Sequence, residues 1–291
     1  MYKEHIAFET PVDSTVIWRY MDFDKFESLL EDQAIYFLNF KRFEDHFEGL
    51  YPFSNWKHFH DVIMQQKWYD LENPDNPVLT LELVKRIGRH FKENFDKPYP
   101  FEEWKLIYES DNWGRNTDIR VLFELVELME AHISWQYLKG GNFINCWSGG
   151  ERESSKMWKN FTTEGKGVCI KSSVKRLKEC FAEDGEYGVR IGTVIYIDYL
   201  TDYLPPDKNA YYIFTHKDRE HDYEKEVRVY VLEEGRECRN KKNIYVPVSL
   251  GTLIEKIYIS PTADEHLLND VKAITEKHNL KKEVLLSDLR N

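Results

Sequence analysis

The sequence contains few cysteines, and none of them has the spacing of a metal site. Among 291 residues there are 4, Cys146, Cys169, Cys180 and Cys238, and no two of them form a Cys-x-x-Cys pair. This spacing argues against a zinc ribbon. We expect free thiols, as in proteins of a reducing compartment.

A long apolar run is also missing. No stretch approaches the roughly 18 apolar residues that a membrane-spanning helix needs. The segment from Met1 to Thr10 carries charges in place of the apolar centre of a signal peptide. We therefore expect a cytoplasmic protein that has no membrane partner.

Positive charge is in the minority. The chain has 40 Lys and Arg against 51 Asp and Glu, a net charge of −11. It therefore lacks the electrostatic footprint of a general nucleic-acid binder, although a local basic cleft remains compatible with this balance. Hydrophobic residues make up 42% and aromatic residues 15%. These fractions predict a folded chain whose core or cleft is rich in flat side chains.

The order of the segments predicts an α+β fold. Stretches rich in β-branched and aromatic residues predict strands, over 15–20, 34–38, 142–148, 168–171, 189–199, 224–232, 244–248 and 254–259. Residues 53–140 instead show helical periodicity with little strand signal. We expect one domain over 1–291, with a mixed or mainly antiparallel sheet as its core and a helical insertion at 53–140.

The stretch from Tyr223 to Leu232 carries the strongest functional signal. If it is a strand, Glu224, Glu226 and Arg228 share one face, and the valines between them face the core. Two carboxylates and a guanidinium are costly to bury unless they are paired or used. The face is therefore either an exposed sheet surface with cross-strand ion pairs or the floor of a site.

A pair of glutamates can act at an N-glycosidic bond. One carboxylate, such as Glu226, can stabilise the oxocarbenium ion that forms when the bond breaks. Glu224 can orient or deprotonate the incoming nucleophile. Arg19, on a neighbouring strand, can hold a phosphate, and Ser148, at a strand end, can brace the glutamate.

Metal and nucleophile signals are weaker. The spacing of His58 with His60, and of His216 with His221, does not place two imidazoles together on a helix. Asp45-His-Phe-Glu48 could bind a cation, but no feature requires one, and we expect no metal. The chain has no Gly-x-Ser-x-Gly motif.

Four blocks of the sequence resemble the bacterial DUF2971 family. They are Trp18-Arg-Tyr20 with the strand after it, Arg42 to Gly49, Cys146-Trp-Ser148 with the segment after it, and Lys217 to Arg228. The second block departs from the family's Asn-Asp-Pro-Phe-Glu pattern at Glu44 and His46, so a role tied to the Asn or Pro does not transfer. The resemblance implies no particular activity.

A second resemblance is to the ADP-ribosyltransferase superfamily, in its Arg-Ser-Glu class. Arg19, Ser148 and the pair Glu224 and Glu226 match that class in residue type and order. The resemblance implies NAD as substrate, with Arg19 at a phosphate and Ser148 supporting the site. It also implies Glu226 as the catalytic residue and Glu224 as the residue that positions the acceptor. To these we add the following candidates: Trp147 for NAD binding, and Lys217, Arg228, Arg42 and Asp45 for substrate binding.

Three functions remain open. The first is an ADP-ribosyltransferase-like effector that uses NAD and a protein or nucleic-acid acceptor, in a setting such as bacterial defence. It requires Arg19, Ser148 and Glu226 to converge on one cleft. The second is a non-enzymatic nucleotide- or protein-binding module, in which Arg228 and Lys217 neutralise Glu226 as a structural network. The third is a metal-dependent hydrolase or nuclease.

Overall fold

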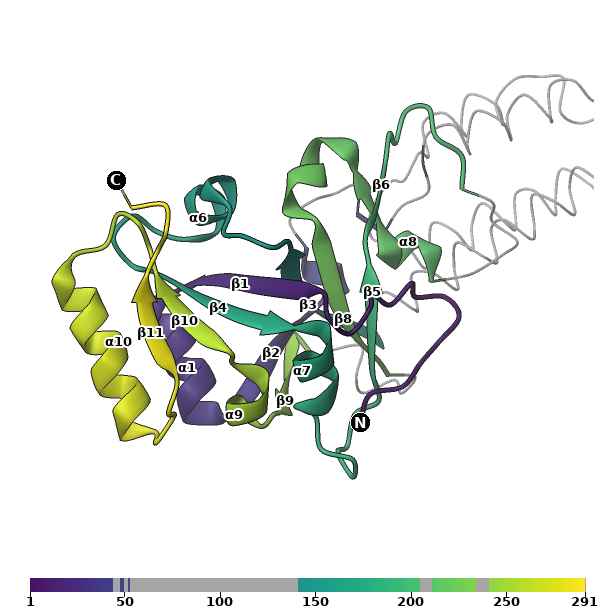
Figure 1. The fold of residues 1–291 in the computed structure, drawn as a ribbon. Helices are drawn as coiled ribbons and strands as arrows, with labels where there is room; N and C mark the ends of the chain where they lie inside the picture. Colours follow the sequence, from purple (N-terminus) through teal and green to yellow (C-terminus); the bar gives the residue numbers. More distant parts are fainter. Residues whose placement is uncertain (44–47, 50–51, 53–140, 205–210, 234–240, 291) are drawn as a thin grey trace, which may run out of the picture. The chain divides into compact units, whose positions relative to one another are not determined.

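The computed structural model describes residues 1–43, 48–49, 52, 141–204, 211–233 and 241–290 (Figure 1). The chain divides into two units, one of Met1–Leu50, Gln136–Asp202 and Asn209–Asn291, the other of Tyr51–Trp135 and Tyr203–Lys208. All elements below belong to the first unit. The predicted helical insertion at 53–140 lies outside the described residues and stays a prediction.

A nine-stranded sheet forms the first unit. Its strands are β1 (Val16–Asp22), β2 (Ala34–Asn39), β3 (Asn142–Gly149), β4 (Gly167–Ser173), β5 (Val189–Thr193), β8 (Glu226–Leu232), β9 (Asn243–Pro247), β10 (Lys256–Ile259) and β11 (Glu283–Leu286). The strands run in the order β11-β10-β4-β1-β3-β2-β9, and β8 joins β3 to β5. Every pair is antiparallel except β10 with β11. The α+β fold with a mainly antiparallel sheet is confirmed.

Strand β3 is the centre of this sheet. It pairs with β8 from Asn142 opposite Leu232 to Ser148 opposite Glu226. Its other edge is shared, because β2 pairs near its beginning and β1 pairs at its end. The side chains of β3 therefore connect those of β1, β2 and β8.

One face of the sheet carries the main hydrophobic core, and we call it the core face. It bears Ile17, Trp147, Val227 and Val229. The core face is covered by α1 (Phe23–Asp32), α7 (Val174–Glu179), α9 (Leu250–Leu253) and α10 (Glu265–Lys277), whose buried residues join the same cluster (Figure 1). Amphipathic helices of this kind bury one apolar stripe against a sheet.

The opposite face is more polar, and we call it the polar face. Tyr20 of β1 lies on it and packs against Trp158 of α6 (Ser155–Phe161), and Trp18 belongs to the same cluster. Ser154 caps α6, since its side chain accepts a hydrogen bond from Met157 N at 3.3 Å. Figure 1 shows α6 on the side of the sheet away from α1 and α10.

The predicted strand at 189–199 differs in extent from the structure. The stretch 189–199 divides into β5 and β6 (Ile195–Ile197), and β6 pairs in parallel with β7 (His216–Asp218). Gly192 pairs regularly with Arg228, so the register of β5 with β8 is continuous at the glycine. A Cβ at Gly192 would lie 3.0 Å from Phe8 Cβ, which explains the glycine by close approach of the N-terminal segment.

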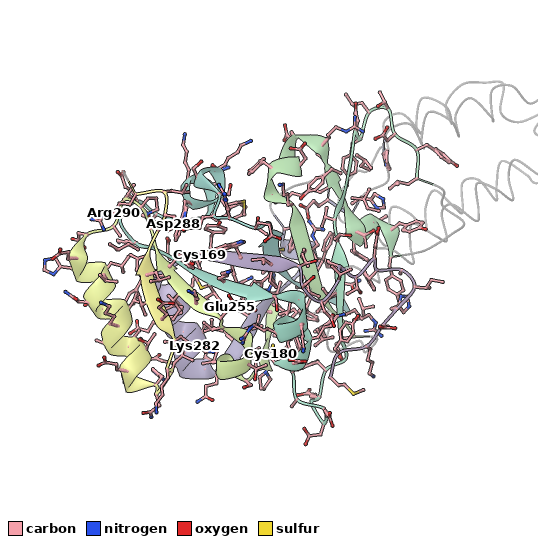
Figure 2. The ribbon with its side chains drawn as sticks, in the orientation of Figure 1. Cys169, Cys180, Glu255, Lys282, Asp288 and Arg290 are labelled. Atoms are coloured by element: carbon pink, nitrogen blue, oxygen red, sulfur yellow. The ribbon has the colours of Figure 1, made fainter. Side chains whose placement is uncertain are left out.

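Cys146, Cys169 and Cys180 are free thiols, as predicted, and Cys238 lies outside the described residues. Figure 2 shows Cys169 on β4 well separated from Cys180, which follows α7. Within the described part of the chain, no helix is both long and apolar enough to cross a lipid bilayer.

Candidate functional site: a buried acidic cluster on the polar face

The two glutamates of the Glu-x-Glu motif do not lie on one strand. Glu224 ends the 3-10 helix η2 (Arg219–Glu224), and β8 begins only at Glu226. Lys225, between them, has a left-handed backbone with φ of 43°. The prediction that one strand carries Glu224, Glu226 and Arg228 is therefore wrong for Glu224. All three side chains nevertheless join one cluster.

Arg228 lies at the centre of this cluster and is 0% exposed. Its Nε donates to Glu226 Oε1 at 2.8 Å, and its Nη2 donates to Glu226 Oε2 at 3.0 Å. Nη2 also donates to Glu48 Oε2 at 3.0 Å, and Nη1 donates to Phe214 O at 2.8 Å. A buried guanidinium is stable only with partners of this kind.

Lys217 joins the three carboxylates. Its Nζ lies 2.8 Å from Glu224 Oε2, 3.3 Å from Glu48 Oε1 and 3.6 Å from Glu226 Oε2. We call Glu48, Glu224, Glu226, Lys217 and Arg228 the acidic cluster. With all five side chains charged, its three carboxylates and two cations leave one negative charge uncompensated.

The environment moves the pKa values of the two motif glutamates in opposite directions. Burial raises the pKa of Glu224, and the charge and hydrogen bond of Lys217 offset this only in part. Burial would also raise the pKa of Glu226, but the charge and hydrogen bonds of Arg228, with the charge of Lys217, lower it to about 2. Glu226 is therefore held ionised, whereas Glu224 takes up a proton more readily than an ordinary glutamate.

Neighbouring groups fix both glutamates. Ser148 Oγ donates to the backbone carbonyl of Glu224 at 2.7 Å, and the backbone N–H of Glu226 donates to Tyr196 Oη at 2.8 Å. Ser148 thus holds the backbone of Glu224, and its expected support of an NAD site stays a prediction. Burial raises the pKa of the Cys146 thiol, and the nearby charge of Glu226 raises it further.

Arg19 and Trp147 lie on the core face. Directly opposed residues of antiparallel strands share a face, so Trp18 and Glu226, both opposite Ser148, belong to the polar face. Arg19 follows Trp18 on β1, and Trp147 precedes Ser148 on β3. Because successive side chains of a strand point to opposite faces, Arg19 and Trp147 point to the core face. The expected convergence of Arg19, Ser148 and Glu226 on one site is not found.

Arg19 and Trp147 do contact each other. The Arg19 guanidinium lies 5.9 Å from the centre of the Trp147 ring, and its Nη1 donates to Cys146 O at 2.7 Å. Burial lowers the pKa of Arg19, and no carboxylate pairs with it among the described residues. The roles of Arg19 and Trp147 in NAD binding stay predictions, and the two residues lie on the face of the sheet opposite the acidic cluster.

The remaining candidates divide between the cluster and the surface. Lys217 and Arg228 belong to the acidic cluster. Arg42 is exposed at the end of the 3-10 helix η1 (Phe40–Arg42), and Asp45 lies outside the described residues. Sequence reasoning missed the part that Glu48 plays beside Arg228, because 180 residues separate the two.

A possible metal grouping lies close to the cluster. Asp218, Glu220 and His221 each place one potential ligand atom within 4.8 Å of the others. Asp218 Oδ1 accepts a hydrogen bond from Glu220 N at 2.9 Å and so caps η2. Helix capping accounts for this grouping, and it gives the metal-dependent hypothesis no further support.

Comparison with known proteins gives little. No family model matches the sequence, and no curated protein matches it either. Among solved structures, the chain is similar to Thermus sp. 2.9 DarT in complex with ADP-ribosylated ssDNA. The identity is 10% and the TM-score is 0.35, over 97% of this chain and 98% of that one. At this TM-score the similarity carries no functional argument.

Proposed function

We propose that this chain breaks the N-glycosidic bond of NAD and transfers ADP-ribose to a macromolecular acceptor. The Arg-Ser-Glu arrangement expected from the sequence is not its basis, because Arg19 lies on the core face. The proposal rests instead on the two motif glutamates, whose carboxylates share Lys217 while their pKa values move in opposite directions. Neighbouring carboxylates separated in this way suit different chemical roles.

The roles follow from the pKa values. Glu226, held ionised by Arg228, stabilises positive charge that develops on the ribose as the bond from C1′ to nicotinamide breaks. The bonding electron pair leaves with the nicotinamide nitrogen. The acceptor nucleophile forms the new bond to C1′ and gives its proton to Glu224, whose raised pKa suits a general base.

The net charge of the acidic cluster supports the same chemistry. One uncompensated carboxylate in a buried setting favours a cation over an anion, because low effective dielectric strengthens the interaction. Arg228, with no exposed surface, acts through Glu226. Lys217, whose side chain is 12% exposed, is the cation of the cluster that we place against a substrate.

A second function is favoured by one observation. Arg228 occupies both carboxylate oxygens of Glu226, and the pair is nearly inaccessible to solvent. A structural network of this kind belongs to a non-enzymatic binding module as readily as to an enzyme. The two functions differ in whether the Glu224 carboxylate is needed for chemistry.

The test is nicotinamide release from NAD by the purified protein, with cell extract as the source of acceptors. We expect release from the wild type, and a loss of about 100-fold or more in Glu224→Gln, the usual effect of removing a general base. Glu255→Gln, at a half-buried ion pair with Lys171, is the control and should retain activity.

Thermal unfolding of each variant separates lost chemistry from lost folding. Release that is equal in the wild type and in folded Glu224→Gln would contradict the proposed role of Glu224. Absence of release from the wild type would favour the binding module.

A further inference from the structure

Two tyrosines form an exposed pair at the edge of the sheet. Tyr36 of β2 lies directly opposite Tyr245 of β9, the last strand on that side (Figure 1). Their ring centres are 5.5 Å apart with an interplanar angle of 73°. The two residues are 41% and 48% exposed. An exposed aromatic pair of this kind offers ring faces on which a flat ligand can stack.

The pair lies on the same face of the sheet as the acidic cluster. Leu38, two residues after Tyr36, is opposite Ile144 of β3. Cys146, two residues further along β3, is opposite Arg228 of β8. Since side chains two residues apart share a face, the polar face runs without interruption from Tyr245 to Arg228.

Three cations gather at one end of the tyrosine pair. Arg42 follows β2, and Lys241 and Lys242 precede β9. Asn39 joins the two segments, because its backbone N–H donates to Lys242 O and its Nδ2 donates to Lys241 O, both at 3.0 Å. The cations are thereby brought together from positions 200 residues apart in the sequence, at 42 and 242.

These cations are available for a ligand. Arg42, Lys241 and Lys242 are all exposed, and none of them forms an ion pair with any described residue. Burial raises the pKa of Tyr36, and the positive charge of Arg42 acts to lower it. A local group of cations that form no ion pair within the described part of a chain of net charge −11 is suited to a polyanion.

We propose that Tyr36, Tyr245, Arg42, Lys241 and Lys242 form a surface that binds single-stranded nucleic acid. We call these five residues the tyrosine–lysine surface. Unpaired bases stack on aromatic rings while cations contact the phosphates, and a duplex offers no free base faces for such stacking. If the proposed NAD chemistry holds, this surface brings a nucleic-acid acceptor to the face that carries Glu224. That last step rests on the proposed function.

The proposal is tested by fluorescence anisotropy with labelled single strands of thymidine and of uridine nucleotides, and with a duplex, in the absence of NAD. We expect the wild type to bind a single strand more tightly than the duplex. The stronger of the two single strands identifies DNA or RNA as the partner. We expect Tyr36→Ala and Tyr245→Ala each to weaken binding roughly 5- to 100-fold, while Tyr36→Phe retains it.

Two controls are matched to these changes. Phe161→Ala removes another exposed aromatic ring, which is 43% exposed on α6, and should leave binding unchanged. Lys241→Glu with Lys242→Glu should weaken binding and reduce its salt dependence by about 0.7 per lost phosphate contact. The control is Lys272→Glu with Lys277→Glu on α10, which changes the net charge by the same amount and should have little effect on binding.

Failure of this proposal is distinct from failure of the NAD chemistry. Absence of binding by the wild type, or equal weakening by the matched controls, would overturn the tyrosine–lysine surface whatever the result of the nicotinamide assay. Glu255→Gln should bind the single strand as the wild type does, because Glu255 belongs neither to the acidic cluster nor to this surface.

Discussion

The guanidinium of Arg228 holds both carboxylate oxygens of Glu226, with Nε at 2.8 Å from one and Nη2 at 3.0 Å from the other. The two residues are neighbours on the same face of β8, so the strand itself places the pair. Both are almost fully buried. The pair therefore contributes to the fold as well as to any chemistry at Glu226.

Removing one member of this pair should be costly. We expect Glu226→Gln to lower the free energy of unfolding by about 3–5 kcal/mol, because it leaves a buried guanidinium without its main partner. Urea denaturation measures the change. Glu255→Gln, whose carboxylate is 31% exposed beside Lys171, should cost less than about 1 kcal/mol. Equal costs for the two variants would contradict a structural role for the buried pair.

The stability of the protein should depend on the ionisation of Glu226. Its pKa is about 2 in the folded chain against an ordinary value of 4.5. A lowered folded pKa contributes stability that is present above the unfolded pKa and is lost as the pH falls toward the folded pKa. We expect the difference in unfolding free energy between wild type and Glu226→Gln to narrow from about pH 5 downward. A difference that stays constant over this window would contradict the lowered pKa.

Gly192 should not accept a side chain. A Cβ there would lie 3.0 Å from Phe8 Cβ, so we expect Gly192→Ala to destabilise the fold by about 1–3 kcal/mol through overpacking. Gly251, in α9, has open space where a Cβ would lie, with no neighbouring atom within 4 Å. We expect Gly251→Ala to be neutral or to stabilise by about 0.5–1 kcal/mol. Chemical denaturation measures the unfolding free energy of both variants. A greater loss of stability in Gly251→Ala than in Gly192→Ala would contradict the close approach of Phe8.

Ser148 should support Glu224 through a single hydrogen bond. Ser148→Ala removes the donor to the Glu224 carbonyl and should cost about 1–3 kcal/mol, since that carbonyl is left buried without its partner. Under the proposed function it should also reduce nicotinamide release. Ser28→Ala, at an exposed hydrogen bond with Asp32, is the matched control. A loss of stability no greater than that of the control would show that the bond is dispensable.

The strands could be predicted because their signals are local. The alternation of apolar and polar residues around Val227 and Val229 identified β8 and its buried face, and both valines are buried. The β-branched stretch before Arg19 likewise identified β1. The alternation of side chains was therefore predicted correctly for β1 and for β8 from Glu226 onward.

The relation between strands could not be predicted in the same way. Whether Arg19 shares a face with Glu226 depends on the register of β1 with β3 and of β3 with β8. A shift of one residue in either register would place Arg19 on the same face as Glu226. The part played by Glu48 depends on a contact across 180 residues, for which the sequence has no local signal.

The left-handed backbone at Lys225 places the two glutamates in different elements, which hold them in different ways. Glu226 belongs to a strand bonded on both edges, to β3 and β5, whereas Glu224 belongs to a short 3-10 helix. The distance between the two carboxylates is therefore not the regular two-residue spacing of a strand. It depends on the backbone conformation of Lys225 and on the contacts of both carboxylates with Lys217. Glu226 is thus held in place by strand pairing on both sides, whereas Glu224 is held by the hydrogen bond of Ser148 to its carbonyl and by Lys217 at its carboxylate.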